Sequence, residues 1–158
     1  MRRPGLPPHG SAGEGVSRLT WYAAGLSAAA SILHGLSAAE HFNEWWGYAA
    51  FFVIAAVAQM GYAIILLISP WRYDATGGIR TDGGTDVARI YYLLGIAGNA
   101  AIVALYLVTR TVGIPFFGPE AADVEPVGAI DVISKLTELT LIAVLLRLHR
   151  PAPAHGQG

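Results

Sequence analysis

The chain of 158 residues contains no cysteine, which excludes disulfides, thiolate metal ligands, cysteine nucleophiles and lipidated cysteines. Charge is also scarce: 13% of the residues are charged, whereas soluble domains carry about 25%. The net charge is −1 and no basic tract is present, so the composition gives no indication of nucleic acid as a partner. The sequence also lacks a GxSxG motif, a phosphate loop and a dinucleotide fingerprint. Nothing in it supports a nucleophilic or nucleotide-dependent enzyme.

Apolar residues dominate what is present, at 54% of the chain. They gather in four long segments, each near the ~20 residues that a helix needs to cross the hydrocarbon core of a bilayer. We therefore predict an all-α, polytopic membrane protein with a four-transmembrane-helix bundle over residues 19–149. The spans are expected at about 20–39, 44–69, 87–109 and 127–148, between flexible cytoplasmic tails at 1–18 and 150–158.

The basic residues predict the orientation of these spans. Eight arginines fall on one side of a four-span arrangement, and Arg110 alone falls on the other. The positive-inside rule then places both termini and the second connection in the cytoplasm of a multi-pass cell-membrane protein. The eight are Arg2, Arg3, Arg18, Arg72, Arg80, Arg89, Arg147 and Arg150.

One alternative concerns the first span. It follows a basic start and ends near Ser37–Ala38–Ala39, which resembles a signal-peptidase site. Against cleavage, the leader before the span is long, and the apolar run includes His34 and lasts nearly a full span. Both readings remain open at this point.

Ionisable residues inside the fourth span are the strongest pointer to function. Asp131, Lys135 and Glu138 are spaced i, i+4 and i+7, so a helix places all three on one face. Charges at bilayer depth are costly and rarely face lipid, and they therefore mark candidate functional sites.

The first span carries a matching polar face. Ser27, Ser31, His34, Ala38 and His41 recur at steps of four, three, four and three residues. Counting depth along the spans then predicts two polar layers, which would open toward the outside. The central layer is an intramembrane network of Gln59, Asn99, Lys135 and Glu138, and the outer layer contains His34, His41, Glu44 and Asp131.

The outer layer has the ligand types of a divalent metal site. Two histidines with carboxylates suit zinc, copper or iron. The spacing is not that of a known metal motif, and His34 and His41 lie about 10 Å apart along a straight helix, so each would need ligands from other helices. Haem ligation is less favoured, because no further membrane-embedded histidine exists in the chain to complete a bis-His site.

Two other interpretations compete with ligand binding. In the first, the charges only specify helix pairing in a structural subunit, a homo-oligomer or a larger membrane complex, because Lys135 can be neutralised by the acids on its own helix face. In the second, Asp131, Lys135 and Glu138 conduct protons or a small ion from the outer face. This row of ionisable residues ends at the midplane of the membrane, since apolar residues follow Glu138 in the fourth span.

Two stretches carry a resemblance to known proteins. TRTVGIPFFGPEAADVEPVGAIDVISKLTE, together with HGLSAAEHFNEWWGYAAFF before it, is similar to small four-span membrane proteins of high-GC bacteria. The resemblance covers the last three spans and part of the first. It implies the four-span architecture and no particular activity.

Overall fold

The computed structural model describes residues 11–73, 76–79, 84–113, 118, 124 and 126–150. Within these residues the chain forms four α-helices, one 3-10 turn and no β-strand. The all-α class predicted from the sequence is therefore confirmed for the described part of the chain. The helices are α1 (Ser11–His41), α2 (Trp46–Ile68), α3 (Thr85–Thr111) and α4 (Ala129–His149), and the 3-10 turn η1 is Pro70–Arg72.

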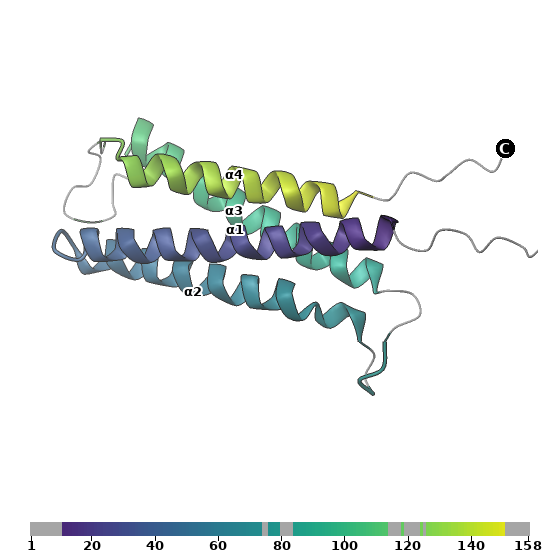
Figure 1. Cartoon of the computed structure of the whole chain (residues 1–158). Helices are drawn as coiled ribbons and strands as arrows, with labels where there is room; N and C mark the ends of the chain where they lie inside the picture. The colour runs from purple at the N-terminus through teal and green to yellow at the C-terminus, as the bar shows by residue number, and fades with distance from the viewer. Residues whose placement is uncertain are drawn as a thin grey trace, which may run out of the picture.

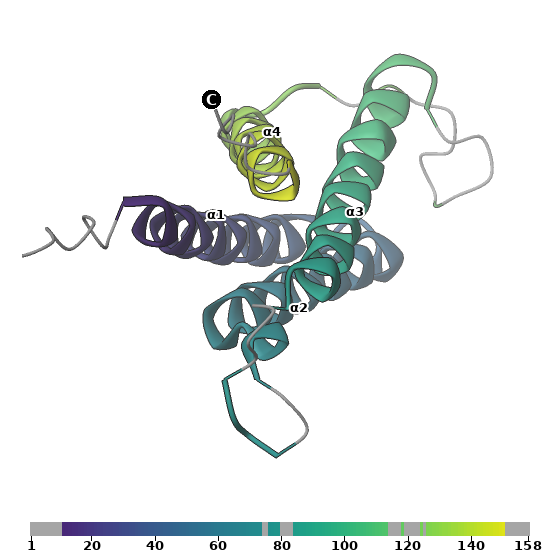
Figure 2. The same ribbon diagram turned by 90° about the vertical axis from the view of Figure 1, so that its right-hand side faces the viewer.

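The four helices form one bundle (Figure 1). α1 packs along both α2 and α4, and α3 packs against α4. Figure 2 shows that α3 is inclined to the other three helices. We call the end of the bundle that holds the α1–α2 turn and the start of α4 the turn end, and the opposite end, which holds the start of α1 and the end of α4, the terminal end.

Local sequence explains where the helices stop. Pro70 cannot continue α2, and Ser69 before it adopts a left-handed conformation (φ 50°) that lets its N–H bond the Ile65 carbonyl at 2.8 Å. Gly84 begins α3 with φ 61°, and a Cβ there would collide with the Trp71 carbonyl oxygen. Glycine is required at this position by both its backbone conformation and the close approach.

The observed helices differ from the predicted spans chiefly at the N-terminus. α1 begins at Ser11, inside the predicted tail 1–18, because the prolines of that tail all precede residue 9 and nothing after them interrupts a helix. The Ser37–Ala38–Ala39 sequence lies within α1. Residues 1–10 and 151–158 of the predicted tails lie outside the described residues. The other bounds shift by one or two residues, with 44–69 observed as Trp46–Ile68, 87–109 as Thr85–Thr111 and 127–148 as Ala129–His149.

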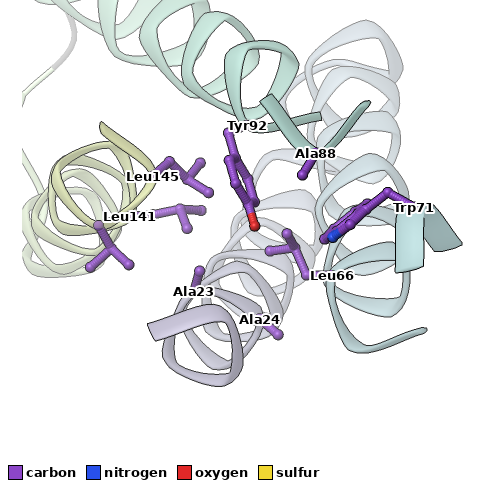
Figure 3. Close-up of a cluster of buried hydrophobic side chains, with 9 residues drawn as sticks. Ala23, Ala24, Leu66, Trp71, Ala88, Tyr92, Leu141 and Leu145 are labelled. Atoms are coloured by element: carbon purple, nitrogen blue, oxygen red, sulfur yellow. The ribbon is translucent and has the colours of Figure 1, made fainter. Parts of the chain in front are cut away.

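The buried apolar core lies toward the terminal end (Figure 3). Trp71 and Tyr92 pack edge to face, with ring centroids 5.7 Å apart, and join the segment after α2 to α3. Leu66 from α2 and Leu141 and Leu145 from α4 complete the contact and are fully buried. Small residues of α1, Ala23 and Ala24, let these side chains approach its backbone.

Large apolar side chains also cover the outside of the bundle. Two helices within the described residues are long and apolar enough to cross a membrane, over Trp46–Arg72 (mean hydropathy 2.4) and Thr85–Thr111 (mean hydropathy 1.8). Exposed apolar side chains occur on every helix, and examples are Ile32 and Leu36 on α1, Ile54 and Val57 on α2, Ile90 and Leu94 on α3, and Ile133 and Leu136 on α4.

Candidate functional site

Glu138 is the centre of a buried ionic cluster. It lies on α4, its side chain is fully buried, and its Oε1 accepts a hydrogen bond of 2.8 Å from His34 Nε2 on α1. Lys135 lies on the same face of α4, and its Nζ is 2.6 Å from Glu138 Oε2. The two groups form an ion pair, but the angle between them does not fit a hydrogen bond. Because a carboxylate only accepts, His34 must carry a proton on Nε2. The cluster thus joins α1 to α4 and satisfies the most deeply buried acid of the described residues.

A second ion pair joins α3 to α4 nearer the turn end. Asp131 Oδ2 accepts from Arg110 Nη2 at 2.7 Å and from the Gly128 backbone N–H at 3.0 Å. The second contact closes the first turn of α4, where an acid also interacts favourably with the helix dipole. The sequence predicts Arg110 as the single arginine on the outer side. In the structure its side chain pairs with Asp131 and is only 10% exposed.

His41 and Glu44 form a third and more exposed pair. His41 ends α1, and its Nδ1 contacts Glu44 Oε2 across the short turn to α2. Phe52 of α2 stacks against both histidines of α1, with ring centroids 5.0 Å from His41 and 6.0 Å from His34. Both histidines therefore share an aromatic neighbour from α2.

The four predicted metal ligands do not come together as one group. His34 pairs with Glu138, His41 with Glu44, and Asp131 with Arg110. Among the described residues, no group of three or more histidine, aspartate or glutamate side chains is arranged to hold a metal ion. Within the predicted outer layer only His41 and Glu44 contact each other, and His34 and Asp131 each pair with a residue outside that layer.

The amide residues of the predicted central layer do meet. Gln59 Nε2 donates to Asn99 Oδ1 at 2.9 Å, and Asn99 Nδ2 donates to the Gly95 carbonyl of its own helix at 2.8 Å. Ser27 of α1, which the sequence placed on the polar face, lies within hydrogen-bond distance of both the Gln59 backbone oxygen (2.7 Å) and its Oε1 (2.8 Å). These contacts connect α1, α2 and α3. Lys135 and Glu138 belong to the separate cluster with His34.

A cavity of about 310 Å³ opens between the four helices toward the turn end. Its walls are mostly aromatic and aliphatic, and its polar side chains come from α1, α3 and α4. Both cations of the site, Arg110 and Lys135, lie over the Tyr106 ring, at 5.2 and 5.3 Å from its centroid. The lining residues are His34, Ser37, His41, Tyr48, Phe51, Phe52, Ile102, Leu105, Tyr106, Thr109, Arg110, Asp131, Ser134 and Lys135.

Of the fourteen lining residues, the sequence predicted four as site residues (His34, His41, Asp131 and Lys135), and among the ten that it missed are Arg110 and Ser134. Arg110 had a visible signal, because it was the single arginine on the side that the positive-inside rule leaves uncharged. Ser134 lies one residue before Lys135 and has no such signal. It is 4% exposed, and its hydroxyl has no hydrogen-bond partner among the residues that the structure describes.

The loop between α3 and α4 touches the rim of the cavity at one described point. Gly118 has φ +90°, and a Cβ there would collide with the Tyr48 hydroxyl. Tyr48 lines the cavity. A glycine is therefore required where the loop passes this side chain.

No protein-family model, curated protein or solved structure matches the chain.

Proposed function

We propose that the chain is a four-span integral membrane protein that binds a small amphiphilic molecule in the cavity at the turn end. The support for four spans comes from the polarity of the two less apolar helices. On α1, Ser27, Ser31 and His34 are buried, whereas Ile32 is 61% exposed and Leu36 is 51% exposed. A bundle with polar side chains inside and large apolar side chains outside suits hydrocarbon surroundings, since scattered exposed apolar residues are ordinary but a surface rich in them is not.

α4 follows the same rule. Asp131, Lys135 and Glu138 face the bundle interior, while Ile133 (54% exposed), Leu136 (59% exposed) and Leu139 (49% exposed) face outward. These three ionisable residues lower the mean hydropathy of the helix, and yet none of them would contact lipid directly. Ionisable side chains within membrane helices face the interior and pair with one another.

The pairing of Arg110 strengthens the proposed orientation. The residue is held by Asp131, mostly buried, and is not part of a free basic loop. By their place in the sequence, the remaining arginines precede the first span, lie in or beside the second connection, or follow the fourth span, on the side that the positive-inside rule assigns to the cytoplasm. The turn end and the cavity would face outward.

The orientation can be tested directly because the chain lacks cysteine. Asn43→Cys places a single thiol in the exposed α1–α2 turn, and Thr76→Cys places one in the exposed second connection. A membrane-impermeant maleimide applied to intact cells should label Asn43→Cys and should label Thr76→Cys only after permeabilisation. Labelling of both from outside, or the reverse pattern, would contradict the four-span topology.

The ligand proposal rests on the cavity. Its volume of about 310 Å³ lies at the lower end of the roughly 300–1,000 Å³ typical of small-molecule sites. Such sites combine mainly apolar walls with a few convergent polar groups, which is the arrangement of this cavity. Because the histidines and carboxylates form separate pairs, an organic molecule suits the cavity better than a metal ion.

The test uses four probes with the same two-ring body: 2-ethylnaphthalene, 2-acetylnaphthalene, 2-naphthoate and 2-naphthylmethylamine. Thermal unfolding of three proteins is followed by circular dichroism in one detergent. The proteins are the parent, Leu105→Trp and Leu94→Trp. Leu105→Trp fills the cavity, whereas Leu94→Trp adds the same ring to the outer face of the same helix. At least one probe at 100 times its dissociation constant should stabilise the parent and Leu94→Trp by ~2.7 kcal/mol and leave Leu105→Trp unchanged. Equal shifts in all three proteins, or none, would contradict binding in the cavity.

A further inference from the structure

One donor in the wall of the cavity has no partner within the described part of the chain. Ser134 is on α4, lines the cavity, and its buried hydroxyl makes no hydrogen bond to any described residue. Two other hydroxyls of the same helix behave differently: Thr137 donates to the Ile133 carbonyl at 2.8 Å, and Thr140 donates to the Leu136 carbonyl at 2.7 Å. A hydroxyl in a helix normally satisfies itself this way, and a buried one left without a partner costs free energy. Ser134 therefore holds, in the wall of the cavity, a buried hydroxyl that no described residue satisfies.

Lys135, the next residue, adds further donors at the same place. Its ammonium has three N–H groups and no acceptor, and its protein contacts are one carboxylate oxygen of Glu138 and the face of Tyr106. It lines the cavity, whereas Glu138 lies behind it and is fully buried. The polar side of the cavity near Ser134 thus offers hydrogen-bond donors.

The two buried ion pairs at the cavity balance in charge. Lys135 is paired with Glu138, and Arg110 is paired with Asp131. His34 donates its Nε2–H to Glu138 and needs no positive charge to do so. An additional ionic group inside this low-dielectric site would have no counter-ion, and the cost of burying an unpaired charge is high.

Aromatic rings line the remaining walls. Phe51, Phe52, Tyr48 and Tyr106 come from α2 and α3 and surround the space beside the donors. Rings stack favourably on rings, in offset or edge-to-face arrangements. A flat, apolar body suits these walls better than a charged or strongly hydrated one.

From these observations we infer that the ligand is uncharged and presents a carbonyl-type hydrogen-bond acceptor on a flat apolar body, with the acceptor held by Ser134 and Lys135. The inference rests on the proposed binding function and specifies its ligand class. An aromatic ketone or a quinone has this chemistry. A carboxylate would bring an unpaired negative charge, and an amine would bring a donor where donors already predominate.

The four naphthalene probes test this inference, because they differ only in the group attached to the rings. In calorimetric titration of the detergent-solubilised parent, 2-acetylnaphthalene should bind about tenfold more tightly than 2-ethylnaphthalene, since the acceptor gains hydrogen bonds that the ethyl group cannot make. Tightest binding by 2-naphthoate or by 2-naphthylmethylamine would overturn the inference and leave the proposed binding function intact. Absence of binding by all four would overturn both.

Ser134→Ala separates a ligand contact from a structural role. The hydroxyl has no protein partner, so its removal should leave folding intact and weaken 2-acetylnaphthalene about fivefold, while 2-ethylnaphthalene binds as before. Thr140→Ala, which removes an exposed hydroxyl from the same helix, is the matched control and should change neither affinity. If Ser134→Ala affects both probes equally, or neither, then Ser134 does not hold the acceptor.

Discussion

Replacing Glu138 by glutamine should destabilise the bundle more than any other single removal of charge. The substitution keeps the shape of the side chain and can still accept the hydrogen bond from His34. It removes the negative charge that pairs with the Lys135 ammonium, whose side chain is 14% exposed. Breaking a buried ion pair from one side costs about 3–5 kcal/mol, because the other ion stays buried without its partner.

We expect a value near the lower limit of that range, since Lys135 keeps its contact with the face of Tyr106. A loss of about 3 kcal/mol corresponds to a fall of roughly 6–12 °C in the unfolding midpoint of a chain of this length. Thermal unfolding in detergent, followed by circular dichroism at 222 nm, measures the change. Glu40→Gln, which removes an exposed acid from the end of α1, is the matched control and should stay within about 1 °C of the parent.

Two further variants make this reasoning refutable. Lys135→Met leaves Glu138 with its hydrogen bond from His34, so it should be less harmful than Glu138→Gln. The double variant Lys135→Met/Glu138→Gln buries neither ion and should regain most of the lost stability. If Glu138→Gln unfolds within about 2 °C of the parent, or if the double variant is as unstable as Glu138→Gln alone, the ion pair does not hold α4 in place.

Three other substitutions test the packing around the site. Asn99→Ala removes the acceptor of the α2–α3 amide hydrogen bond and should lower the free energy of unfolding by about 1 kcal/mol. The same thermal unfolding measures this change, and an unchanged midpoint would contradict the network. Gly118 has φ +90°, and Gly118→Ala forces a Cβ against the Tyr48 hydroxyl. The variant should therefore bind the probes more weakly in the calorimetric titration. Equal affinity would show that the loop does not shape the cavity. Gly95→Ala collides with the Tyr62 hydroxyl at the α2–α3 contact and should cost about 1–3 kcal/mol, and adding Tyr62→Phe should restore part of that loss if the collision is its cause.

The helices were predictable because long apolar runs separated by proline and polar segments leave little choice of secondary structure. The buried face of α1 was also predictable: Ser27, Ser31, His34 and Ala38 recur at helical spacing, and all four are buried. The start of α1 was missed because the tail was judged by its composition, although its prolines end before the helix begins.

The pairing of ionisable residues was not predictable from depth along the spans. Depth counting placed His34 one layer away from Glu138, yet their side chains hydrogen bond at 2.8 Å. Counting is accurate to about one turn, and the rotation and inclination of each helix decide which residues of adjacent turns meet. The Arg110–Asp131 pair has the same origin, because it depends on how the end of α3 lies beside the start of α4.

The uneven distribution of apolar packing along the bundle has a consequence for its internal motion. α3 is held near its start by Tyr92 and Trp71 and at its middle by Asn99, whereas its last turns border the cavity and are secured chiefly by the Arg110–Asp131 pair. Segments with fewer buried contacts open more often, and their amide hydrogens exchange sooner. Deuterium uptake along α3 should therefore rise steadily from Tyr92 toward Thr109, so that this helix behaves as an arm anchored at one end.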